Sequence, residues 1–218
     1  MTKRFYSPSD APAPAPFRKP WMLAGILLCF MGCNFANAEH PGFRPESELA
    51  AAFLESVKSA KVAVYPVIIR TVAGTSYSED SQKQVVSMLN EKRVTVAVAK
   101  AGTIDPGELK GEGQLALFQN DLKTIAEQLK GFDSDADYSL VMEVLFPPHR
   151  PAVFGIHCYV YDRQGENAFS FLLNSHHKLF VDADMTAEDS SEASRAEMME
   201  KATKVGVTAL MQQIDFGL

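Results

Sequence analysis

The sequence predicts an α/β fold, in which one mixed sheet in the order β-α-β-α-β-β-β-α has helices packed on it and follows a signal peptide. Two observations predict this fold. Apolar, β-branched runs alternate with segments of helical periodicity between residues 61 and 130. Three strand-like runs then follow one another directly, and a last helical segment closes the chain.

The first 38 residues have the pattern of a secretion signal. Four Lys and Arg residues precede an apolar run at 21–35, and Ala36 and Ala38 supply the small side chains that a signal peptidase requires. We therefore expect cleavage between Ala38 and Glu39 and a periplasmic or secreted protein. The apolar run is shorter than the roughly 20 residues of a membrane span, but Gly32-Cys33 leaves a lipoprotein anchored through Cys33 as an alternative.

The remaining 180 residues suit one domain. Residues 39–60 are expected to form an arm and a short helix, and 61–218 a single α/β domain. With 17 Lys and Arg against 26 Asp and Glu, this part of the chain is acidic, which argues against nucleic acids and anionic membrane surfaces as partners, because both require a basic face. Its one cysteine, Cys158, excludes an internal disulfide and lies in an apolar run typical of a buried position. No cofactor is expected.

Each element follows from its local pattern. The apolar run 61–71 predicts a buried strand with either a kink or an edge position at Pro66, and residues 74–78 predict a turn. The next expected elements are a helix from 78 or 79 to 90, a strand at 93–99, a surface loop at 102–113 and a helix at 114–130. The apolar stripe of this last helix consists of Leu115, Phe118, Leu122, Ile125 and Leu129.

The strands 137–146, 152–161 and 168–180 are expected to form an antiparallel meander, with a turn at Asp162–Gly165. Phe169, Phe171 and Leu173 then share one face, which indicates either a covered core strand or a strand exposed for edge pairing with a partner. A final helix is expected at 187–214, capped by Thr186 and Asp189. Its inner face would consist of Met198, Ala202, Val205, Ala209 and Gln213.

Three segments carry a family resemblance: Lys61–Pro66 in the first strand, Asp137–Glu143 after a helix, and Tyr161–Gly165 in the last hairpin. Together with the element order, they resemble the amino-terminal domain of TolB and the periplasmic domains of CsgG-type and penicillin-binding-protein-activator lipoproteins, over residues 61–214. The resemblance implies a non-catalytic envelope module that binds protein partners. These families usually carry Gly where this chain has Glu143.

The candidate site residues are the histidines His157, His176 and His177. If the hairpin turn centres near Gln164-Gly165, His157 lies opposite Leu172, and His176 lies about 13 Å further along at roughly 3.3 Å per residue. Adjacent residues of a strand also point to opposite faces. A shared metal ion, whose ligands lie about 2 Å from it, is therefore not expected.

Nucleophilic catalysis has no clear signature either. Ser170 and Ser175 are available, but the Gly-x-Ser-x-Gly pattern of a nucleophile elbow does not occur. The sequence thus leads to two hypotheses. The first is a non-catalytic accessory or binding module of the bacterial cell envelope, with an envelope protein as partner. The alternative is a periplasmic hydrolase or metal-binding protein that uses His157, His176 or His177.

Overall fold

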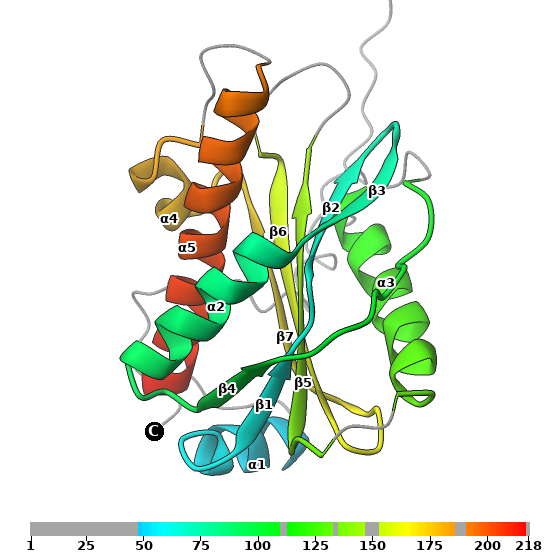
Figure 1. The fold of residues 1–218 in the computed structure, drawn as a ribbon, viewed down its shortest axis with the longest axis vertical. Coiled ribbons are helices and arrows are strands. Elements are labelled where there is room, and N and C mark those ends of the chain that lie inside the picture. The colour runs from blue at the N-terminus through cyan, green and yellow to red at the C-terminus, as the bar shows by residue number, and fades with distance from the viewer. Residues whose placement is uncertain (1–47, 110–112, 133–134, 147–152, 186–190, 217–218) are drawn as a thin grey trace, which may run out of the picture. The chain divides into compact units, whose positions relative to one another are not determined.

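The computed structural model describes residues 48–109, 113–132, 135–146, 153–185 and 191–216. In these residues the protein has an α/β fold with a single mixed sheet of seven strands and five helices (Figure 1). The predicted signal segment 1–38, with Ala38, Glu39 and Cys33, lies outside the described residues. So do the proposed helix cap at Thr186 and Asp189 and residues 110–112 of the predicted loop.

The strand predicted at 61–71 is two strands, β1 (Lys61–Val64) and β2 (Val67–Thr71). Both lie parallel to the same long strand, β5 (Tyr138–Leu145), on either side of Pro66. Val64 lies opposite Leu140 and Ile68 opposite Glu143, so the chain carries one more residue than β5 between these points. The prediction of one continuous strand was wrong, but the interruption at Pro66 is confirmed, since the extra residue forms a bulge there.

The turn predicted at 74–78 is also wrong, because this segment is strand β3 (Gly74–Ser78) and pairs antiparallel with β2. The chain reverses over Val72 and Ala73, and Gly74 adopts a φ of +135° that favours glycine. Once β2 offers an unpaired edge, the alternating Thr75 and Tyr77 favour pairing over an open loop.

Helix α2 (Glu79–Glu91) begins directly after β3, where the Ser78 hydroxyl accepts a hydrogen bond from the amide of Ser81. Strand β4 (Val96–Ala99) then pairs parallel with β1. It is shorter than the predicted 93–99, and Arg93 has a positive φ of 53° that does not fit a strand.

The predicted meander is confirmed. Strands β5, β6 (Gly155–Asp162) and β7 (Asn167–Asn174) are antiparallel neighbours, and His157 lies opposite Leu172 as the turn position predicted. The Asp162 carboxylate accepts hydrogen bonds from two turn amides, which fixes the β6–β7 hairpin.

The third meander strand ends at Asn174, however, and not at 180. The Asn174 side chain accepts a hydrogen bond from the amide of His176, and the short helix α4 (Lys178–Asp182) begins after His177. An Asx-type turn therefore ends the strand early. His176 and His177 therefore lie in this turn. The prediction that they belong to the third meander strand was wrong.

Helices cover both faces of the sheet (Figure 1). Side chains of α1 (Glu48–Ser56), α2, α4 and α5 (Glu192–Phe216) join the larger apolar core on one face. The predicted inner face of the last helix is confirmed, and its five residues are all buried. Phe169, Phe171 and Leu173 are buried in the same core, as the covered-strand interpretation predicted.

Helix α3 (Gln114–Leu129) is the one described helix whose side chains join the smaller core on the other face. Its predicted stripe is partly wrong: Leu115 is 42% exposed and Leu122 is only half-buried. Leu117 and Asp121 are buried in their place, beside Phe118, Ile125 and Leu129. The buried face is therefore rotated from the predicted stripe, and it includes a carboxylate.

Candidate functional site

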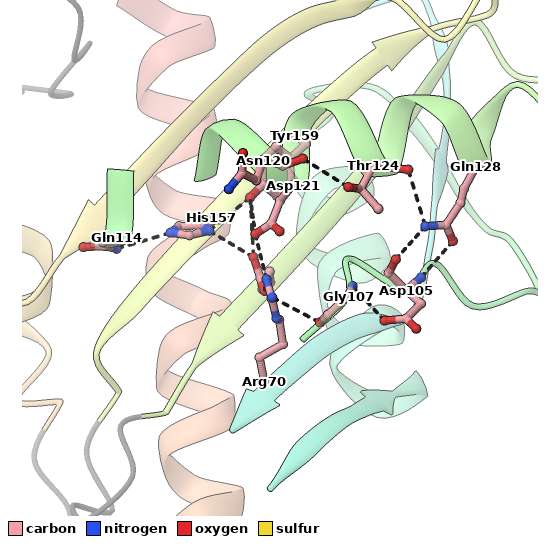
Figure 2. Close-up of polar contacts among 11 residues, drawn as sticks. Arg70, Asp105, Gly107, Gln114, Asn120, Asp121, Thr124, Gln128, His157 and Tyr159 are labelled. Carbon is pink, nitrogen blue, oxygen red and sulfur yellow. Dashed lines mark hydrogen bonds and ion pairs between the residues drawn. The ribbon is translucent and has the colours of Figure 1, made fainter. Parts of the chain in front are cut away.

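A group of ionisable side chains is buried between α3 and the sheet (Figure 2). It comes from four elements and is called the ion cluster here. Its members are Arg70 of β2, Asp121 of α3, Glu143 of β5, and His157 and Tyr159 of β6. The cluster lies near the carboxyl ends of the parallel strands β2 and β5, which is where α/β sheets usually place their ligands.

The bulge at Pro66 brings Arg70 into the ion cluster. Before the bulge, Ala63 and Tyr65 face the α3 side of the sheet; after it, Ile68 belongs to the same core. The alternation of side chains thus shifts by one residue, because a one-residue insertion exchanges the two faces of a strand. Without the shift, Arg70 would point into the larger apolar core and away from the carboxylates.

Arg70 bridges the two carboxylates through one nitrogen atom. Its Nη1 donates to Asp121 Oδ2 and to Glu143 Oε1, both at 2.7 Å. Its Nη2 donates to the carbonyl of Gly107 at 3.1 Å, in the loop that precedes α3. Nε is buried and has no hydrogen-bond partner. One cation therefore connects β2, α3, β5 and this loop.

Glu143 and His157 lie directly opposite each other in the antiparallel β5–β6 pair, so their side chains share a face. His157 Nδ1 lies 2.9 Å from Glu143 Oε2 and 3.0 Å from the Tyr159 hydroxyl. The other ring nitrogen lies 3.3 Å from Gln114 Nε2, at the beginning of α3. With Gln114 as donor, His157 Nε2 accepts and the Nδ1 proton is directed at Glu143.

Gln114 covers His157 because Gly155 leaves room for it. Gln114 Nε2 also donates to the carbonyl of Leu173 on β7 at 3.1 Å. A Cβ atom at Gly155 would lie 2.1 Å from Gln114 Nε2, a distance that no side chain tolerates. The glycine at the beginning of β6 therefore permits the contact that closes this side of the ion cluster.

The two carboxyl groups of the cluster have opposite pKa shifts. Burial and the nearby Glu143 charge raise the pKa of Asp121 to about 7, although Arg70 acts in the opposite direction. Burial also opposes ionisation of Glu143, but the hydrogen bonds and charges of His157 and Arg70 outweigh it, and the pKa of Glu143 lies below its usual range. Burial and both carboxylates raise the pKa of Tyr159, which stays a neutral donor. Asp121 is thus the carboxyl group that exchanges a proton near neutral pH.

A metal ion is the first chemistry to test at this position. Asp121, Glu143 and His157 each offer a ligand atom, and these atoms lie within 4.8 Å of one another. Arg70 Nη1, however, already occupies the space between the two carboxylates, and a divalent cation there would meet a fixed positive charge. The guanidinium supplies the charge that a metal would supply, so the donor set does not fit a resident cation.

The ion cluster does not contact solvent. The side chains of Arg70, Asp121, Glu143 and His157 are at most 2% exposed. A catalytic group must touch its substrate, and here each carboxylate is already engaged by the guanidinium or the imidazole. In this arrangement the cluster binds α3 to three strands, and its side chains are buried between them.

The sequence identified one of the cluster residues, His157, and missed the others. His176 and His177 lie beyond the end of β7 and do not join His157. The sequence did contain a signal for two of the missed residues, because Arg70 and Glu143 are single charged residues inside apolar strand runs. Charged residues in buried strands are almost never found without a partner, so each of them indicated a buried ion pair. Asp121 gave no comparable signal, since acids are common on helices.

A second feature is an open groove of about 470 Å³ beside α1. Asp137 and Tyr138, from one segment of the family resemblance, line it together with Asp162, Arg163 and Gln164 from another. Arg163 donates to Asp137 at 2.8 Å, and Tyr138 shares a 2.8 Å hydrogen bond with Ser56 of α1. Its polar groups are therefore partly satisfied by one another.

Comparisons with protein-family models, with curated proteins and with solved structures found no match. None of the described helices is both long enough and apolar enough to span a membrane.

Proposed function

We propose that this protein is a non-catalytic accessory or binding module of the bacterial cell envelope, exported by residues 1–38 and released between Ala38 and Glu39. One observation supports the non-catalytic part of the proposal above all: the three candidate histidines do not converge. His157 is buried in the ion cluster, whereas His176 and His177 follow the end of β7, where His176 is exposed and His177 half-buried.

The resemblance to TolB-type and CsgG-type periplasmic domains gives the proposal its envelope setting. The open groove supports it, because two of the segments that carry the resemblance, around Asp137 and Arg163, meet there. The groove has the size of a small recognition site. Its lining is mixed in charge and suits a polar segment of a protein partner.

The alternative, a metal-binding protein or hydrolase, draws on the closeness of Asp121, Glu143 and His157. It requires Arg70 to leave its two carboxylates and Gln114 to uncover the imidazole. Two buried carboxylates would then depend on the incoming ion for compensation, which is a large rearrangement for a well-packed interface.

Affinity capture from native envelope extracts, followed by calorimetry with the purified partner, tests the binding role. We expect a saturable complex with the wild-type protein and weaker binding with a groove variant, Arg163→Glu. Lys83→Glu on α2, another exposed cation, serves as the control and should bind as the wild type does. The lack of any partner that binds in purified form would contradict the proposal.

Two further measurements separate the alternatives. Zinc titration should show no stoichiometric binding, and tight binding that His157→Ala abolishes would instead establish the metal-binding alternative. Mass spectrometry of the exported protein should give a chain that begins at Glu39; a lipid-modified Cys33 would replace the soluble form of the proposal with a lipoprotein.

A further inference from the structure

The second face of the sheet depends on one described helix. Phe118, Ile125 and Leu129 of α3 pack there, and Phe118 stacks on the Tyr159 ring with the centroids 5.1 Å apart. The polar attachment of α3 to the strands is concentrated in its first half, where Asp121 meets Arg70 and Gln114 meets His157. The stability of this helix on the sheet therefore depends on the charge state of the ion cluster.

The net charge of the ion cluster is zero only when the cluster binds one exchangeable proton. Arg70 supplies one positive charge, while Asp121 and Glu143 supply two negative charges when both are ionised. One additional proton, on Asp121, makes the cluster neutral. If that proton is lost, an uncompensated negative charge stays buried, and such a charge destabilises the interface that encloses it.

We propose that the ion cluster is a proton-dependent clamp, which holds α3 on the sheet at mildly acidic pH and loosens the helix as the pH becomes alkaline. The ionisable groups that face Asp121 are Arg70 from β2, Glu143 from β5, and His157, Tyr159 and Tyr161 from β6. Gly107, in the loop before α3, adds a carbonyl that Arg70 binds (Figure 2).

The proton equilibrium of Asp121 places this change near neutral pH. Its pKa in the packed state is about 7, whereas a solvated Asp has an ordinary value of 3.8. Since the packed state binds the proton more tightly, deprotonation favours the loosened state. Loosening would uncover apolar side chains of the sheet that α3 now covers, among them Val141.

Hydrogen exchange measured by mass spectrometry at pH 6 and pH 8 tests the clamp. Exchange times are corrected for the intrinsic effect of pH on amide exchange. The quantity compared is the ratio of the opening equilibrium constant of α3 peptides to that of α5 peptides. For a group that titrates near pH 7, we expect this ratio to be about tenfold higher at pH 8 than at pH 6.

Asp121→Asn keeps the shape of the side chain but cannot lose a proton, so its ratio should be the same at both pH values. Asp80→Asn changes an exposed acid of α2 and should behave as the wild type does. An unchanged ratio in the wild type, or equal loss of protection in α3 and α5, would overturn the proposal. If Asp121→Asn does not fold, the ratio in the wild type and in Asp80→Asn still decides.

Discussion

Replacing Arg70 by Met tests whether the buried guanidinium holds the second face of the protein together. Met is a shorter but flexible, unbranched side chain without a charge. The change takes away both 2.7 Å ion pairs, to Asp121 and to Glu143, and the bond to the carbonyl of Gly107. At neutral pH, Asp121 and Glu143 then stay buried without the cation that compensates their negative charge.

The expected loss of stability is large. Breaking a buried ion pair from one side typically costs about 3–5 kcal/mol, because the remaining charge stays buried. A domain of this size has about 5–15 kcal/mol of folding free energy, so the change removes a substantial part of it. The loss should be smaller in mildly acidic buffer, where Asp121 takes up a proton and no longer needs the guanidinium.

Urea denaturation at pH 5.5 and pH 8 measures this effect. Arg163→Met is the matched control, because Arg163 also pairs with an aspartate, Asp137, but its side chain is 55% exposed. Ion pairs at the surface contribute about 0–1 kcal/mol, so the control should change the midpoint little. Adding Asp121→Asn to the Arg70→Met variant should recover part of the lost stability at pH 8.

Two results would refute this reasoning. If Arg70→Met and Arg163→Met lower the free energy of unfolding by the same small amount, the guanidinium does not stabilise the packed state. If Arg70→Met is equally destabilised at pH 5.5 and pH 8, the loss does not come from an unpaired carboxylate.

Three further predictions follow from the same structure. In urea titrations at different pH values, the wild-type protein should be most stable at mildly acidic pH. Because the pKa of Asp121 is raised in the folded state, the free energy of unfolding falls as the pH rises toward and through 7. Because the pKa of Glu143 is lowered, the free energy of unfolding also falls as the pH drops below the usual Glu range near 4.5. A maximum above pH 8 would contradict the assignment. Ile125→Ala should cost about 2–5 kcal/mol, while Leu115→Ala, which changes an exposed side chain, should cost less than about 0.5 kcal/mol; similar midpoints for the two would mean that α3 buries another face. Gly155→Ala should displace the Gln114 side chain and lower the melting temperature, and an unchanged melting temperature would show that this contact is dispensable.

Several features of the fold were predictable because they depend on residues close in sequence. The turn residues at Asp162–Gly165 fixed the β6–β7 hairpin, and a hairpin turn sets the register of its strands, which placed His157 opposite Leu172. The periodicity of the last helix predicted its buried face for the same reason. Pro66 cannot continue a strand ladder, so the interruption there was visible as well.

The candidate site was not predictable in this way. Apolar runs show that a strand is buried on both faces, but they do not show which strand lies beside it. Glu143 meets His157 through the β5–β6 register, and Asp121 comes from a helix whose buried face is set by what the sheet offers. The predicted apolar stripe excluded Asp121, because periodicity alone ranks a carboxylate as exposed.

The sequence by itself determined an α/β chain with an antiparallel meander, a long carboxyl-terminal helix and no internal disulfide in the part after residue 38. Only the tertiary structure decided that Arg70 points toward two carboxylates, because one extra residue at the Pro66 bulge exchanges the faces of the strand that follows. The physical reason is that a bulge is defined against its partner strand, and that partner lies more than 70 residues away in the chain.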